Sequence, residues 1–242
     1  MEYPDILLKR ICQIRKNFDI ISLVIILHKI NTVLFDLDGT LVDSNELIIQ
    51  SFKETFKHYQ PKKEYSRQQF IEMIGPPLKE TFRIVSEDPK IIHEMIDFYR
   101  SFYQKHEFEY ISLYPNVIET LEELKKLNVN LGIVTTKFKE SAMPSIQHFQ
   151  IDKYITNYSF LGSVKEHKPS PEPIFHVLEQ FTGVDLALMV GDNPSDIMAG
   201  KNSGILTCGI EWSLVKDKLI KTNPTFWIKD YLDIIDIVKE ER

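Results

Sequence analysis

The chain has 242 residues, 43% of them hydrophobic and 26% charged, which is enough for one well-buried core and a smaller accessory unit. Its net charge of −6, with no long cluster of lysine and arginine, argues against a nucleic acid partner, because binding a phosphate backbone needs a concentrated positive surface. The two cysteines, Cys12 and Cys208, have no metal-ligand spacing, which argues against a disulfide framework and a zinc site and favours a reducing compartment, the cytoplasm.

The first thirty residues contain an apolar run, Ile20 to Leu27, that follows several basic residues. The run is far shorter than the roughly 20 apolar residues that a membrane-spanning helix requires, and no small-residue cleavage site follows it. We therefore expect no stable membrane association. We interpret residues 1–30 as a dispensable N-terminal extension, either a segment packed on the surface or a leader added by an upstream start codon.

From Thr32 onward, short apolar runs of strand character alternate with segments of helical periodicity. The expected strands are 32–35, 129–135, 186–190, 205–209 and 225–228, and the expected helices are 116–127, 139–149, 171–181 and 194–203. This alternation predicts right-handed crossovers and hence an α/β fold, with a Rossmann-like parallel sheet covered by helices on both faces. Such a sheet binds ligands at the carboxyl ends of its strands.

One long stretch, Asn45 to Phe108, breaks the alternation because it shows helical periodicity only. Candidate helices lie at 45–59, 66–74, 78–85 and 89–108. This is too much chain for a crossover helix, so we predict an inserted helical cap over residues 45–112, hinged near Ser44 and Ser112, that covers the strand ends. Residues 31–44 and 113–242 would then form the catalytic core.

Two carboxylates end the first expected strand. Asp36 and Asp38 directly follow the apolar run, and Gly39 marks the turn out of the strand. The carboxylates would repel each other and lose hydration there, which a hard divalent cation with oxygen ligands relieves, and Mg²⁺ is the natural candidate. An isolated pair of this kind is often a solvated turn, but its place after a buried strand favours catalysis.

Two further motifs can hold an anion. Thr135 and Thr136 end an expected strand with hydroxyls and backbone N–H groups that can bind phosphoryl oxygens, although Thr135 could equally be a helix N-cap. Lys168 is fixed by the prolines of His167-Lys168-Pro169-Ser170-Pro171, so its ammonium can be aimed at a reacting phosphate. The alternative for Lys168 is an ordinary solvated lysine in a proline-rich loop.

The fourth motif is a second pair of carboxylates. Asp192 follows the expected strand 186–190, and Asp196 lies four residues further, one helical turn on and on the same side. This spacing lets both carboxylates face one cation, directly or through water. The alternative is that Asp192 or Asn193 only caps the helix that begins at Pro194.

Residues 32–209 resemble haloacid dehalogenase-like hydrolases, because the family's four signature motifs are matched in order by DLDGTLVDS, VTTK, HKPSPEP and VGDNPSDI. The position of the expected helical cap is similar to that in phosphoglycolate phosphatase and its relatives. The resemblance implies an aspartyl-phosphate mechanism with Asp36 as nucleophile and Asp38 as general acid/base. It places Thr135, Thr136 and Lys168 on the phosphoryl group, and Mg²⁺ on Asp36, the Asp38 carbonyl and Asp192, with Asp196 in support. The acidic Asp38 argues against carbon–halogen cleavage, which needs no proton donor.

Three further segments look similar to PpaX-type inorganic pyrophosphatases of Gram-positive bacteria: Asn45–Ile49, Gly75–Phe82 and Gly209–Ser213. On this resemblance we expect pyrophosphate as the substrate. A rigid turn at Gly75-Pro76-Pro77 over the site would present Lys79 to a second phosphate, with Arg83 one turn further along the same face. Glu46 and Gly75 complete the candidate specificity residues.

Other functions share these core motifs. Phosphoglycolate or another small phosphomonoester is the alternative substrate, and a β-phosphoglucomutase-like mutase would carry the same motifs. A non-catalytic binding protein is disfavoured, because a decayed site usually loses at least one charge whose burial is costly without function. The sequence does not indicate the oligomeric state.

Overall fold

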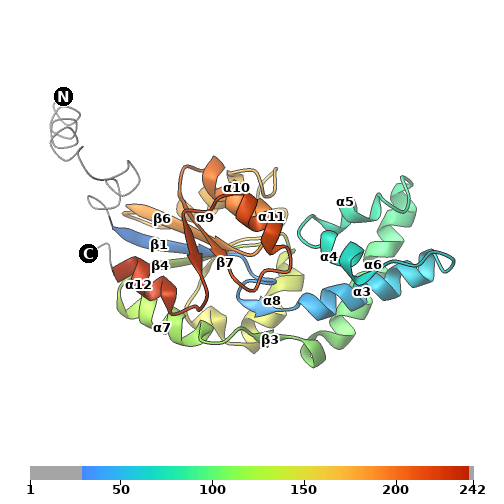
Figure 1. Cartoon of the computed structure of the whole chain (residues 1–242), viewed down its shortest axis with the longest axis horizontal. Helices are drawn as coiled ribbons and strands as arrows, with labels where there is room; N and C mark the ends of the chain where they lie inside the picture. Colours follow the sequence, from blue (N-terminus) through green and yellow to red (C-terminus); the bar gives the residue numbers. More distant parts are fainter. Residues whose placement is uncertain (1–28, 240–242) are drawn as a thin grey trace.

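A computed structural model describes residues 29–239, so the apolar run Ile20–Leu27 lies outside the described residues. The centre is a parallel six-stranded sheet in the order β5-β4-β1-β6-β7-β8 (Figure 1). Its strands are β1 (Ile30–Phe35), β4 (Asn130–Val134), β5 (Asn157–Ser159), β6 (Leu186–Gly191), β7 (Leu206–Ile210) and β8 (Phe226–Ile228). The predicted α/β fold with a parallel sheet is confirmed.

The sheet reverses its direction of winding at β1. Chain order runs outward from β1 through β4 to β5 on one side, and through β6 and β7 to β8 on the other. Crevices that bind ligands form outside the carboxyl ends of the strands where an open α/β sheet reverses in this way. The ends of β1, β4 and β6, which carry three of the four predicted motifs, lie side by side at this point.

The first strand begins earlier than its sequence predicts. Ile30 rather than Thr32 opens β1, so the strand extends into the predicted N-terminal extension. Ile30 is buried and pairs with Leu186, while the side chain of Asn31 donates a hydrogen bond to the Gly183 carbonyl. The polar Asn31 interrupts the apolar run, which is why the pattern hides the start of the strand.

Helices cover both faces of the sheet. One face packs on α7 (Val117–Lys126), α8 (Lys139–His148) and α12 (Asp233–Lys239), and the other on α9 (Glu172–Leu178) and α10 (Pro194–Asn202) (Figure 1). Successive residues of β1 alternate between these two layers: Val33 and Phe35 belong to the first core and Leu34 to the second. Burial on both faces explains why the strand reads as a continuous apolar run.

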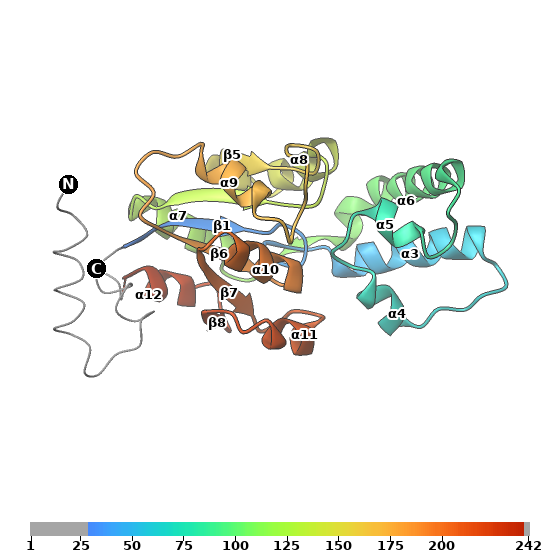
Figure 2. The ribbon, with the colours of Figure 1, turned by 90° about the horizontal axis from the view of Figure 1, so that it is seen from above.

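The helical stretch after β1 packs as a unit of its own. It contains α3 (Asn45–Tyr59), α4 (Arg67–Glu72), α5 (Leu78–Phe82) and α6 (Pro89–Tyr110), and it lies beyond the carboxyl ends of the strands (Figure 2). Its core is aromatic: the ring of Phe52 lies 5.9 Å from that of Phe82 and 5.0 Å from that of Tyr99. The two middle helices are shorter than predicted, and Ser66 begins α4 with a capping box.

Two short strands link this helical unit to the sheet. β2 (Val42–Asp43) and β3 (Ser112–Leu113) pair antiparallel, so the outgoing and returning chains run side by side. Two-residue strands have no periodicity, and they were not predicted. The pairing places Ser44 and Ser112, the expected hinge positions, at adjoining ends of one small sheet.

Other short elements also went unpredicted, namely β5, the 3₁₀ turn Ile151–Lys153, α11 (Lys216–Lys221) and α12. Cys208 is a buried free thiol in β7. Within residues 29–239 no helix combines the length and apolar character that crossing a membrane requires.

Candidate active site

Asp36 and Lys168 form a buried ion pair at the end of β1. The Asp36 backbone N–H donates to the Val190 carbonyl at 3.0 Å, which extends the sheet by one residue and fixes the carboxylate at its edge. Lys168 Nζ lies 2.6 Å from Asp36 Oδ1 and 2.8 Å from the Val134 carbonyl oxygen. Both side chains are almost completely buried, so the solvated-lysine alternative for Lys168 does not hold.

Asp192 and Asp196 complete an acidic cluster around this lysine. Asp192 Oδ1 accepts a hydrogen bond from Thr40 Oγ1 at 3.1 Å, and Asp196 Oδ1 lies 2.6 Å from Lys168 Nζ. Asn193, not Asp192, caps α10: its side chain accepts from Ser195 N, and Asp196 Oδ2 accepts from Asn193 N. The Asp192 carboxylate is therefore not used as the helix cap.

The cluster has the donor set of a hard-metal site. Asp36, Asp192 and Asp196 each place one oxygen within 4.8 Å of the others, and all three are buried. Burial, opposed by Lys168 and reinforced by Asp196, raises the pKa of Asp36 to about 7, and burial together with Asp196 and Asp36 raises that of Asp192 well above its ordinary value. A divalent cation with oxygen ligands would offset this crowding of negative charge, and the residues present fit Mg²⁺.

Gly39 is required by the way Asp192 approaches the first motif. Its φ of +77° lies in the left-handed region, and a Cβ added there would stand 2.5 Å from Asp192 Oδ2. Only glycine lets the turn after Asp38 pass so close to the carboxylate. The same turn brings Thr40, whose hydroxyl also accepts from Asp192 N, against the acidic cluster.

Asp38 lies at the same strand end but outside the acidic cluster. Its Oδ1 accepts a hydrogen bond from Ser44 Oγ at 2.5 Å and another from Lys137 Nζ at 3.0 Å. Lys137 belongs to the second motif, yet no role was predicted for it. Its only signal in the sequence is its place two residues after Thr135.

The two threonines of the second motif end β4. Thr135 is buried, its N–H donates to the Ser159 carbonyl, and its Oγ1 accepts from Lys137 N at 3.2 Å. Phe138, not Thr135, occupies the N-cap position of α8, so the capping alternative does not hold. Thr136 Oγ1 donates to the Gly75 carbonyl at 3.2 Å and so contacts the helical unit.

A cavity of about 1170 Å³ separates the strand ends from the helical unit. It is lined by both predicted catalytic aspartates, the acidic cluster, Lys168 and both threonines. From the helical unit, Gly75, Lys79 and Arg83 line it as predicted, although α5 ends at Phe82, so Arg83 follows the helix instead of lying within it. The side chains of Lys79 and Arg83 are exposed.

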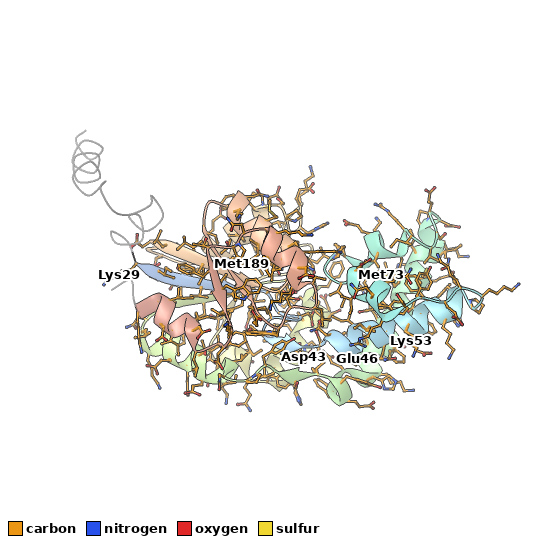
Figure 3. All side chains as sticks on the ribbon, in the orientation of Figure 1. Lys29, Asp43, Glu46, Lys53, Met73 and Met189 are labelled. Carbon is orange, nitrogen blue, oxygen red and sulfur yellow. The ribbon has the colours of Figure 1, made fainter. Side chains whose placement is uncertain are left out.

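Glu46 is the one candidate that the structure does not bring to the cavity. Its carboxylate accepts from Gln50 Nε2 at 2.7 Å and pairs with Arg67 at 2.7 Å. Both contacts lower the pKa of Glu46, and the hydrogen bond from Gln50 is the largest single cause of the shift. In the view of Figure 3, Glu46 and the cavity-lining Met73 lie on opposite sides of α3.

The cavity also has lining residues that sequence patterns did not indicate. Helix α6 contributes Arg100, Tyr103 and Glu107, and the core contributes Lys137 and His167. On an amphipathic helix such as α6, the sequence pattern does not distinguish residues that line a cavity from ordinary core or surface residues. Arg100, Tyr103 and Glu107 meet the strand ends only because the chain folds back on itself over long sequence separations, whereas Lys137 and His167 lie within predicted motifs but had no predicted role.

Comparisons with known proteins show which family the chain resembles. The family described as haloacid dehalogenase-like hydrolase matches residues 33–210. The chain is 38% identical over 211 residues to the pyrophosphatase PpaX of Anoxybacillus flavithermus, covering 86% of this chain and 97% of that protein. It is 39% identical over 212 residues to PpaX of Bacillus pumilus, covering 86% and 96%.

Solved structures show the same fold. A haloacid dehalogenase-like family hydrolase from Streptococcus pneumoniae superposes with a TM-score of 0.73 at 27% identity, covering 86% of this chain and 98% of that one. A hydrolase from Pseudomonas syringae, at 20% identity, shares the fold with a TM-score of 0.75 over 87% and 98% of the two chains. From the extent of the family match and the identity to these relatives, the chain belongs to the haloacid dehalogenase-like hydrolases.

Proposed function

We propose that this hydrolase cleaves inorganic pyrophosphate to two phosphates, with Mg²⁺, through a phosphoryl group carried transiently on Asp36. The observation that carries the proposal is the buried pair of Asp36 and Lys168 inside an acidic cluster, at the floor of a cavity with further cations on its opposite wall. Relatives that match over nearly their whole length are pyrophosphatases.

The metal would be held by the carboxylates of Asp36 and Asp192 and by the backbone carbonyl of Asp38. When bound, Mg²⁺ supplies positive charge that offsets the repulsion between the nucleophile and an anionic phosphoryl group. Asp196 would not bind the metal directly but would orient its neighbours, because its carboxylate lies 2.6 Å from Lys168 Nζ and accepts a hydrogen bond from the Asn193 N–H at 3.0 Å.

Asp36 would attack the phosphorus through a carboxylate oxygen, forming the aspartyl phosphate while the bond to the leaving oxygen breaks. Lys168 would share charge with the phosphoryl oxygens, because its ammonium already lies 2.6 Å from the nucleophile. Thr135 and Thr136 would donate hydrogen bonds to the same group. Asp38 would give a proton to the leaving oxygen and then take one from the water that hydrolyses the intermediate.

The helical unit would act as a cap over this chemistry. We propose residues 45–112 as the cap and residues 31–44 and 113–242 as the catalytic core, joined by the paired strands β2 and β3. Support comes from the separate aromatic core of α3 to α6 and from the cavity between the two parts. Closing such a cavity would exclude water other than the hydrolytic one.

Pyrophosphate fits a cavity that offers cations beyond the first phosphate. Lys79 and Arg83 line it from the cap and form no salt bridge with any described residue. A leaving group without a carbon skeleton needs charge there more than apolar surface. The buried free thiol of Cys208 supports a reducing, cytoplasmic setting as part of the proposal.

A panel of substrates tests the proposal. Phosphate release with Mg²⁺ should give the highest kcat/KM for pyrophosphate among pyrophosphate, phosphoglycolate, sugar phosphates and an aryl phosphate. A tenfold preference for another member, about 1.4 kcal/mol of transition-state stabilisation, would reject pyrophosphate but keep the phosphohydrolase. Conversion of a hexose 1-phosphate to its isomer would indicate a mutase, and no turnover of any member would indicate a binding protein.

A further inference from the structure

Lys137 joins the catalytic strand ends to helix α6 of the cap. Its Nζ donates to Asp38 Oδ1 at 3.0 Å and to the Tyr103 hydroxyl at 2.9 Å, and it lies 4.6 Å from the centroid of the Tyr103 ring. The Lys137 side chain is only 16% exposed, and Tyr103 is buried. The ammonium is therefore held between one group of the core and one group of the cap.

The contacts of Asp38 all fall on one carboxylate oxygen. Oδ1 accepts from both Ser44 Oγ and Lys137 Nζ, whereas Oδ2 has no hydrogen bond or ion pair with any residue between 29 and 239. Two donors on one oxygen fix the orientation of the carboxylate. The second oxygen, Oδ2, is left without a partner among the described residues.

We infer that Lys137 is a positioning residue for Asp38, and that Tyr103 holds Lys137 in place. The inference rests on the proposed role of Asp38 as general acid/base. In the step concerned, Asp38 Oδ2 gives its proton to the leaving oxygen as the bond from phosphorus to that oxygen breaks and the bond from phosphorus to Asp36 forms. Lys137 touches neither of these bonds and acts only through Oδ1.

The surroundings of Lys137 explain why the pair is stable in a buried place. An ammonium taken out of water needs both opposite charge and hydrogen bonds. Glu107 lies one helical turn after Tyr103, lines the same cavity and is 4% exposed, and its Oε1 has no hydrogen-bond partner among the described residues. Helix α6 thus presents a hydroxyl and a carboxylate on the side that faces Lys137.

Two aryl phosphates of equal charge test the inference. The leaving group of p-nitrophenyl phosphate departs without help from an acid, whereas that of phenyl phosphate is more basic and needs a proton. Lys137→Met should therefore lower kcat/KM for phenyl phosphate at least tenfold more than for p-nitrophenyl phosphate. Tyr103→Phe, which keeps the ring, should change the ratio in the same direction by a smaller factor.

Lys139→Met is the matched control, because Lys139 is exposed at the start of α8 and makes no hydrogen bond or ion pair with a described residue. It should leave the ratio of the two substrates unchanged. Equal losses for both substrates in Lys137→Met, as expected of a lysine that binds phosphate or only supports the fold, would overturn the inference. So would an unchanged ratio in both Lys137→Met and Tyr103→Phe.

Asp38→Asn separates this inference from the function on which it rests. It should show the largest leaving-group dependence, and adding Lys137→Met to it should change the ratio no further. If Asp38→Asn has no leaving-group dependence, the proposed role of Asp38 fails. If Asp38→Asn shows the dependence and Lys137→Met does not, only the positioning role fails.

Discussion

At the scale of single residues, the site combines one buried ammonium, that of Lys168, with the buried carboxylates of Asp36, Asp192 and Asp196. Among residues 29–239, Lys168 is the one lysine that pairs with any of the three buried carboxylates, and its Nζ lies 2.6 Å from Asp36 Oδ1 and from Asp196 Oδ1. Burial would lower the pKa of Lys168, but Asp196 and Asp36 outweigh burial and raise it, so the lysine stays charged. With all three carboxylates ionised, one positive charge would not compensate three negative ones, and a divalent cation would supply the missing positive charge.

We expect Mg²⁺ to stabilise the protein, because it would bind the folded cluster and not the unfolded chain. The melting temperature should rise with Mg²⁺ concentration in a calorimetric scan. Asp192→Asn should weaken this response. In the absence of metal, Asp192→Asn should lower the melting temperature less than it does in the presence of Mg²⁺, or even raise it. A melting temperature that does not respond to Mg²⁺ in the unchanged protein would contradict the metal assignment.

The same site predicts how Ca²⁺ acts. Its larger and looser coordination should misalign the attack that near-octahedral Mg²⁺ permits, so Ca²⁺ should compete with Mg²⁺ and inhibit phosphate release. Removal of divalent metal with a chelator should abolish activity, and Mg²⁺ should restore it. Full activity with Ca²⁺ as the only metal would reject this account of the ligands.

At the scale of elements, the loop before α5 is one place where the proposed cap contacts the core. The carbonyl of Ile74 accepts from Asn193 Nδ2 and that of Gly75 from Thr136 Oγ1, both at 3.2 Å. Gly75 has a φ of +115°, and a Cβ there would stand 2.5 Å from Asn193 Nδ2. The predicted rigid turn is thus also a contact between cap and core.

Gly75→Ala should disturb that contact without unfolding the protein, because the clash lies at the surface between the two parts. We expect kcat/KM for pyrophosphate to fall at least tenfold while the melting temperature changes by only a few degrees. Pro76→Ala, in the same turn, serves as the control for a change that adds no atom near Asn193. Activity unaffected by Gly75→Ala would show that the contact is dispensable.

His167 and Glu80 form another contact between the proposed cap and the core, and we expect this contact to depend on pH. His167 Nε2 lies 2.7 Å from Glu80 Oε1 on α5. Burial alone would lower the pKa of His167, but the hydrogen bond with the Lys168 carbonyl and the contact with Glu80 raise the pKa above the ordinary 6.5. Because the folded pKa is raised, the contact contributes stability below pH 6.5 and loses it as the pH rises through the pKa of the folded state. Glu80→Gln should lower the pKa of His167, measured by NMR; an unchanged pKa would contradict the contact.

How far the sequence predicted these elements depends on their length and burial. Strands buried on both faces read as apolar runs, and α3 was predicted with its observed bounds because fifteen residues show the helical period plainly. β5 has three residues, two of them only partly buried, and gives no such signal. Three of the four motifs were visible because each lies at the end of an expected strand, and the Lys168 motif was visible through its prolines. Tyr103, by contrast, meets Lys137 across 34 residues of sequence, which no local pattern reports.

At the scale of the whole molecule, the fold places the basic side chains of Lys79 and Arg83, from the proposed cap, in the same cavity as the acidic cluster at the strand ends. If Lys79 contacts the second phosphate, Lys79→Met should raise KM for pyrophosphate more than for an aryl phosphate, which lacks that charge. Arg83→Met should act in the same direction. Lys90→Met, at an exposed position on α6 outside the cavity lining, is the control. Equal effects of Lys79→Met on both substrates would remove Lys79 from the specificity residues.

Phosphate release by Asp36→Asn is the most direct test of whether pyrophosphate is hydrolysed through Asp36. The substitution keeps the shape of the side chain but removes the attacking carboxylate, so the protein should fold with an unchanged circular dichroism spectrum. With pyrophosphate and Mg²⁺, Asp36→Asn should release phosphate at the rate of the buffer alone. Release at a tenth or more of the unchanged protein's rate would contradict the role of Asp36 as nucleophile.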